Sequence, residues 1–290
     1  MTDGGRRNRR IVVGLKAAAD IDRSVEAATT LAAAIQAEVV GLYVEEDGLL
    51  SLAALPFARV IGHGEGRSER LTEAAMAKAI ARGAVTSRKV LSAHAEKASV
   101  NWSFTVEQGE LASKMRGVLA AGDFLVLSSN HRGFGTEDLL NELRSAPRRL
   151  HGVVLAVSGK AKRPTGPVIA IDDGDAAGRG TVTLASHIAS VLGVPLCLFT
   201  VASSNSEADR IVARARSLAK ATQKIETHRL PIGASQMIAS AIAKFQPSFV
   251  VADQEGEPFG DDAAARALLR TVGAPVLLLR SNGEEPPAPE

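Results

Sequence analysis

The chain has 290 residues, a net charge of +2, a hydrophobic content of 46% and a single cysteine, Cys197. This composition excludes an intrinsically disordered chain and an internal disulfide framework, and the balanced charge gives no support to nucleic-acid binding. The apolar runs fall short of the roughly 18 residues of a membrane span, and no apolar stretch typical of a signal peptide follows the N-terminal charges. We therefore expect a cytoplasmic protein with no membrane span.

Residues 11–157 are predicted to alternate short apolar strands with helices. The strands are continuous apolar and β-branched runs, which is typical of strands buried on both faces of a parallel sheet. They are expected at residues 11–15, 39–44, 101–106, 124–127 and 153–157. The helices are expected at residues 24–36, 69–97, 111–121 and 136–150.

An insertion at residues 45–70 interrupts this pattern after the second strand. It carries a run of apolar side chains, which is unusual because connections normally cross a polar surface. These side chains are Leu49, Leu50, Leu52, Leu55 and Phe57. The segment either folds back on its own domain or is covered by a protein partner, and the five side chains are our candidate partner-binding residues.

The second half repeats the order of the first. Strands are expected at residues 168–171, 195–201, 224–230, 249–251 and 276–279, and helices at 179–192, 206–221, 234–245 and 262–272. Such a duplication predicts an α/β fold of two tandem doubly wound domains, each with a five-stranded, mainly parallel sheet flanked by helices. We expect domains at residues 10–158 and 168–280, a linker at 159–167 and a disordered tail at 281–290.

Several segments of both halves resemble the universal stress protein family in its tandem-domain form. The glycine of Gly109-Glu110-Leu111 in the first half, and that of Pro231-Ile232-Gly233 in the second, matches the family's glycine before its third helix. Residues 268–279 are similar to its last helix and strand, and residues 49–59 to a segment of some proteobacterial stress-protein-like sequences. The resemblance covers nearly all of residues 10–280. It implies that the two halves pair through their last strands as a pseudo-dimer.

The loop that binds nucleotide in this family is altered in both halves. Its pattern is Gly-x2-Gly-x9-Gly-Ser/Thr, in which glycines let backbone N–H groups approach phosphates. The first half has Ser128, His131, Asn141 and Glu142 at the four motif positions. The second half has five carboxylates in this stretch, at Asp253, Glu255, Glu257, Asp261 and Asp262. We expect these carboxylates to exclude a polyphosphate.

The family's aspartate after the first strand is replaced by Lys16 in the first half and kept as Asp172 in the second. Asp172-Asp173-Gly174-Asp175 lacks the order of a calcium loop, so we interpret it as a capped turn leading into the next helix. An anion could still bind in the first half. The candidate ligand-binding residues are Lys16, Ser128, His131, Arg132, Gly133, Gly135 and Asp172.

No catalytic set, nucleophile elbow, phosphate-binding Walker motif or metal-ligand spacing is found. The resulting hypothesis is a non-enzymatic stress-response or regulatory module that binds a protein partner, with no cofactor and with a homodimer as one form of assembly. The alternative is a small-ligand sensor that holds ATP, another adenine nucleotide or another anion in the first half. Weak nucleotide hydrolysis is a third hypothesis, and the missing loop glycines argue against it.

Overall fold

The structure is a computed structural model. It describes residues 9–15, 21–45, 59–61, 68–70, 72–128, 136–156, 165–175, 178–219, 224–231, 233, 235–257 and 259–280. The candidate partner-binding leucines and Phe57 therefore lie outside the described residues, as do Lys16, His131, Arg132, Gly133 and Gly135.

The elements of the first half match those expected from the sequence. The strands are β1 (Arg10–Leu15), β2 (Glu38–Glu45), β5 (Trp102–Gln108), β6 (Phe124–Ser128) and β7 (Gly152–Ala156). The helices are α1 (Ile21–Ile35), α3 (Glu73–Ala98), α4 (Leu111–Val118) and α5 (Thr136–Ser145). Helix α5 ends five residues before its predicted end, because Pro147 disfavours helical backbone at the residue that precedes it.

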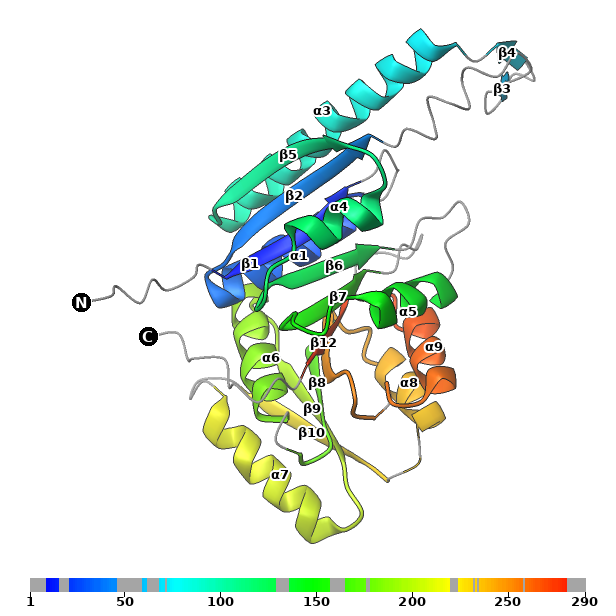
Figure 1. Cartoon of the computed structure of the whole chain (residues 1–290). Coiled ribbons are helices and arrows are strands. Elements are labelled where there is room, and N and C mark those ends of the chain that lie inside the picture. The colour runs from blue at the N-terminus through cyan, green and yellow to red at the C-terminus, as the bar shows by residue number, and fades with distance from the viewer. Residues whose placement is uncertain are drawn as a thin grey trace.

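The insertion contains a short sheet that the sequence did not predict. Strands β3 (Arg59–Ile61) and β4 (Ser68–Arg70) pair in an antiparallel hairpin, so the expected helical start at residue 69 is wrong. Helix α3 instead begins at Glu73, where the Thr72 hydroxyl accepts a hydrogen bond from the Ala75 N–H as an N-cap. In Figure 1 the hairpin lies beyond the N-terminal end of α3.

The second half repeats the arrangement. Its strands are β8 (Val168–Asp172), β9 (Leu196–Val201), β10 (Ile225–Leu230), β11 (Phe249–Asp253) and β12 (Val276–Leu279). Its helices are α6 (Gly178–Leu192), α7 (Asn205–Leu218), α8 (Ser235–Ala243) and α9 (Asp262–Thr271). Equivalent strands keep equivalent partners, since Ile11 pairs with Phe124 and Val168 pairs with Phe249. The predicted α/β class is confirmed.

The two halves form one ten-stranded sheet, ordered β10-β9-β8-β11-β12-β7-β6-β1-β2-β5. Every pair is parallel except β7–β12, where the halves meet edge to edge. At the centre of that junction Val154 faces Leu277, and Val153 faces Leu278. The predicted pseudo-dimer through the last strands is therefore confirmed (Figure 1).

Helices cover both faces of the sheet. Alternate residues along each strand point to opposite faces, so Ile11 and Val13 pack with α1 and α3, whereas Val12 packs with α4 and α5. Helices α6 and α7 extend the first layer, and α8 and α9 extend the second. Both faces of the inner strands are therefore covered by helices, which explains why these strands are apolar without alternation.

Cys197 is the second residue of β9 and is 1% exposed. Burial raises the pKa of its thiol to about 12, with a smaller contribution from Glu226. Because the thiolate is the reactive form, we expect no reaction with a thiol reagent at pH 8 in the folded protein and full reaction in urea. A fast reaction of the folded chain would show that β9 opens locally.

Candidate functional site

The carboxyl ends of β8 and β11 lie side by side near the middle of the second-half sheet. These strands are neighbours, while β9 continues the sheet on the other side of β8. Such a switch point is where open α/β sheets usually bind ligands. Each strand ends in a buried carboxylate, Asp172 on β8 and Asp253 on β11. In the first half, the equivalent strand ends are Leu15 and Ser128, so Leu15 stands at the place of Asp172 and the predicted equivalence of Lys16 with Asp172 is wrong by one residue.

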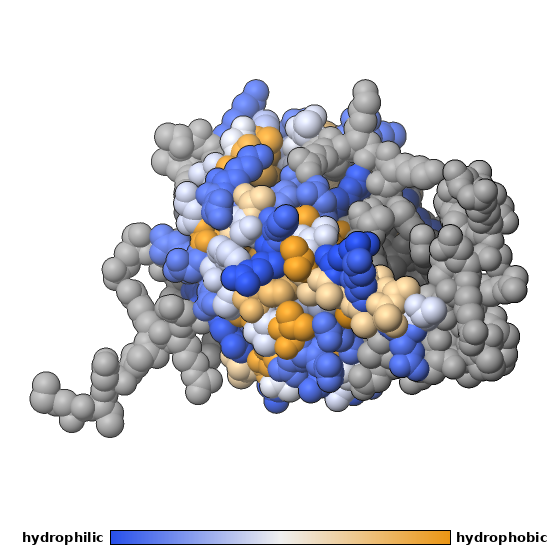
Figure 2. Space-filling view, turned by 90° about the horizontal axis from the view of Figure 1, so that it is seen from above, coloured by the Kyte–Doolittle hydropathy of each residue, from blue (hydrophilic) through white to orange (hydrophobic). Residues whose placement is uncertain are grey.

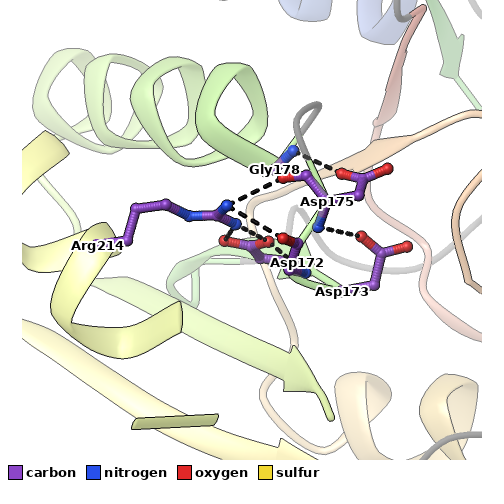
Figure 3. A network of polar contacts seen from close by, with 6 residues as sticks. Asp172, Asp173, Asp175, Gly178 and Arg214 are labelled. Carbon is purple, nitrogen blue, oxygen red and sulfur yellow. Dashed lines mark hydrogen bonds and ion pairs between the residues drawn. The ribbon is translucent and has the colours of Figure 1, made fainter. Parts of the chain in front are cut away.

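The carboxylate of Asp172 is held by an arginine from the neighbouring helix. Arg214 of α7 donates from Nη2 to both Asp172 oxygens, at 2.6 and 2.9 Å (Figure 3). Its Nη1 donates to the carbonyls of Gly174 and Asp175, at 3.2 and 3.0 Å. The Asp172 side chain is fully buried, so this pair is desolvated on the carboxylate side. The carboxylate at the end of β8 is therefore already bound by a side chain of the same protein, Arg214.

The other carboxylates of this loop bond to backbone. Asp172 Oδ1 accepts from the Gly174 N–H at 2.9 Å, and Asp175 Oδ1 accepts from the Gly178 N–H at 3.0 Å. The second bond caps the first turn of α6, as the capped-turn interpretation expected. Burial, followed by the charge of Asp175, raises the pKa of Asp173. In the described ranges, no three His, Cys, Asp or Glu side chains are placed to share a metal ion.

The loop after β11 is also closed by its own carboxylates. Asp253 Oδ1 accepts from the N–H groups of Glu255 and Gly256, at 2.7 and 3.1 Å. Glu257 Oε1 accepts from the Gly233 N–H at 3.1 Å, which links this loop to the turn after β10. These are N–H groups that an incoming phosphate would need. The acidic side chains therefore occupy donors that a polyphosphate would use.

Known structures share this architecture, although no family model matches the sequence and no curated protein matches it in sequence. A universal stress protein from Archaeoglobus fulgidus is 10% identical, with a TM-score of 0.58 over 94% of this chain and 97% of that one. A functionally unknown protein from Pseudomonas aeruginosa is 14% identical, with a TM-score of 0.55 over 94% and 92%. The chain has the fold of the universal stress proteins.

The same architecture occurs in the cytoplasmic domain of a prokaryotic cation chloride cotransporter. That structure is 15% identical, with a TM-score of 0.57 over 96% of this chain and 98% of that domain. The universal stress protein fold therefore accounts for almost the whole chain. Across the described parts of the chain, no helix has the length and hydropathy needed to cross a membrane.

Two site residues lie where the universal stress protein pattern places them. Asp172 ends β8, and Ser128, partly exposed, ends β6. The structure brings neither together with the other candidate ligand residues, which fall outside the described ranges. Their binding roles remain predictions. For Asp172, any such role would require Arg214 to be displaced.

Three site residues escaped the sequence reasoning. Arg214 lies 42 residues after Asp172, and no local pattern signals their contact. Glu257 was counted only as a repulsive charge, whereas it accepts the Gly233 N–H. Gly256 was overlooked as the second glycine of the family pattern. Aligning β11 with β6 would have revealed it, since Asp253 is equivalent to Ser128 and Gly256 to His131.

The space around position 256 explains why a glycine stands there. A Cβ on Gly256 would lie 2.8 Å from Asp173 Oδ2, so a larger residue would require the Asp173 side chain to move. In universal stress proteins this glycine would make room for phosphate. Here it makes room for a carboxylate of the same chain.

Proposed function

We propose that the chain is a non-enzymatic regulatory or stress-response module that acts by binding a protein partner. The observation that carries this proposal is the closed second-half site, where Arg214 holds Asp172 and Glu257 holds the Gly233 N–H. In the described part of this half, Asp172 and the Gly233 N–H are already engaged within the chain, so we assign this half no ligand role. It serves instead as a rigid partner for the first half across β7–β12.

The comparisons support this proposal at the level of the fold. The same architecture occurs in a universal stress protein and in the cytoplasmic domain of a transporter. Fold likeness alone assigns no activity. The candidate contact is the apolar run of residues 49–57, on an insertion that the second half lacks, and a cytoplasmic location remains our expectation.

The second candidate function is a sensor of a nucleotide or another anion in the first half. It is favoured by Ser128, whose place at the end of β6 is equivalent to that of Asp253, where two loop N–H groups meet a carboxylate. The basic residues of that candidate site, Lys16, His131 and Arg132, would supply the charge. ATP or another adenine nucleotide is the ligand we would test first.

The number of nucleotides bound by the full chain separates these functions. We expect equilibrium dialysis with ATP and magnesium to give no more than one ATP per chain, because Asp253 and Glu257 already accept from the loop N–H groups that a phosphate would use. Two ATP per chain would contradict the closed site. No binding, together with no ligand in the mass spectrum of the purified chain, supports the partner-binding module.

One bound ATP per chain would overturn the module in favour of the sensor, provided that the binding depends on Arg132. In that case Arg132→Ala should weaken binding by about 1–3 kcal/mol, the scale for losing a charged hydrogen bond. Arg270→Ala, at an exposed position of α9 in the second half, is the matched control and should leave the affinity unchanged.

A further inference from the structure

The outer edge of β5 is open. In the part of the chain that the structure describes, β5 pairs only with β2, through seven residue pairs from Trp102 to Gln108. The Val39 N–H donates to the Asn101 carbonyl, and the Gly109 N–H donates to the Glu45 carbonyl. Odd-numbered residues of β5 therefore bond to β2, and the even-numbered ones present their N–H and C=O groups outward.

The first five residues of this edge strand lack the devices that usually protect an edge, and its first charged residue is Glu107, which pairs with Lys114. Between Trp102 and Val106 it has no charge, proline or glycine, and Val106 is 46% exposed. The opposite edge of the same sheet, β10, carries Glu226, His228 and Arg229. Charged side chains on an edge discourage pairing with another chain. The two edges are equivalent in the duplication, and the β5 edge is the less charged of the two.

The helix above this edge also offers a surface for close packing. Helix α3 has 26 residues, whereas its equivalent α7 has 14. His94 of α3 bonds to Asp22 of α1, which fixes the side of α3 that faces the molecule. The exposed Ala81 follows Ile80, whose carbonyl accepts from Tyr43, the residue paired with Val106, so Ala81 lies near β5; Ala74 and Ala77 are exposed farther toward the N-terminus of α3. Figure 2 looks onto this end of the molecule and shows hydrophobic patches between hydrophilic ones.

We propose that two copies of the chain associate through β5, which pairs antiparallel with β5 of the second copy, while the two α3 helices pack above the junction. A two-fold axis makes such an edge self-complementary, so a second copy is the partner that this edge fits. The β7–β12 junction is the precedent within the chain. It joins two edges antiparallel, and α1 packs against α6 above it.

The surfaces match in chemistry as well as in geometry. Outward N–H and C=O groups at Trp102, Phe104 and Val106 would each find a partner in the second strand. The small side chain of Ala81 would let the two α3 helices approach closely near the junction. The dimer would continue the ten strands of one chain into those of the other. This proposal does not depend on a nucleotide or on the apolar insertion.

Val106→Pro tests the pairing, because it removes an outward N–H and no bond to β2. We expect the wild-type chain to sediment as a dimer and Val106→Pro to raise the dimer dissociation constant at least about tenfold. The matched control is Thr227→Pro in β10. The Ala202 N–H donates to the Leu230 carbonyl, so odd-numbered residues of β10 point outward, and this variant should stay dimeric.

A spin-label measurement keeps the proposal testable if the proline variant fails to fold. Thr105→Cys places a label on β5, and Glu226→Cys places one on β10, while buried Cys197 stays unlabelled. We expect dipolar coupling between copies for the Thr105→Cys label and none for the Glu226→Cys label. A monomeric wild-type chain, a dimer that tolerates Val106→Pro, or a Thr105→Cys label without coupling would each overturn the proposal.

Discussion

Arg214→Leu is expected to destabilise the folded chain by about 3–5 kcal/mol, the cost of leaving a buried charge without its partner. The Asp172 side chain is fully buried, and Arg214 bonds both of its oxygens. After the substitution, the Gly174 N–H is the remaining donor to this carboxylate among the described contacts. The measurement is the free energy of unfolding from a urea titration at pH 7.

Two variants test whether the lost charge pair causes this effect. Arg216→Leu changes an exposed arginine on the same helix and should stay within about 0.5 kcal/mol of the wild type. Asp172→Asn combined with Arg214→Leu should be less destabilised than Arg214→Leu alone, because no charge is then left unpaired. A loss below 1 kcal/mol for Arg214→Leu would mean that water reaches Asp172, and that the second-half site is open.

Arg280→Met is expected to lower the free energy of unfolding by about 2–4 kcal/mol, because this arginine links the two halves by several charged hydrogen bonds. Its Nη2 donates to the Leu143 carbonyl at 3.0 Å, and its Nη1 donates to the carbonyls of Ala146 and Pro147. Its Nε donates to Gln254 Oε1 at 2.6 Å. Arg280 therefore satisfies the carbonyl end of α5 from the end of β12.

The urea midpoint of Arg280→Met is best compared with that of Arg270→Met. Arg270 is exposed in the last turn of α9, so its loss should cost less than about 1 kcal/mol. A second readout is hydrogen exchange at the β7–β12 junction, which should rise in Arg280→Met and not in the control. Equal midpoints for the two variants would show that the junction is held by strand pairing and helix packing alone.

The sequence predicted the fold closely, for a physical reason. Strands buried on both faces must be apolar throughout, and this local signal located the inner strands; the more polar edge strands β5 and β10 were located with them, and most ends fell within one or two residues. The resemblance to the universal stress proteins supplied the pairing of the halves through their last strands. The hairpin β3–β4 was missed because two strands of three residues carry no period that a pattern could reveal.

The candidate site was only partly predictable. The acidic loop and the departure from the nucleotide motif are local features, and the sequence alone identified them. It interpreted the carboxylates as repelling a ligand. The contacts of Arg214 with Asp172 and of Glu257 with Gly233 add that they also hold the loops closed. Neither contact has a sequence signal, because its partners lie 42 and 24 residues apart and are brought together by helix packing.

The sequence by itself therefore determined the order of the elements, the duplication and the loss of the phosphate loop. The tertiary structure decided which carboxylates are paired, how Arg280 ties the halves together, and which sheet edge stays open. Local patterns of apolar residues indicate which side chains each segment must bury. The partner of a charged side chain or of an edge strand is set by the packing of segments far apart along the chain, and only the folded arrangement specifies it.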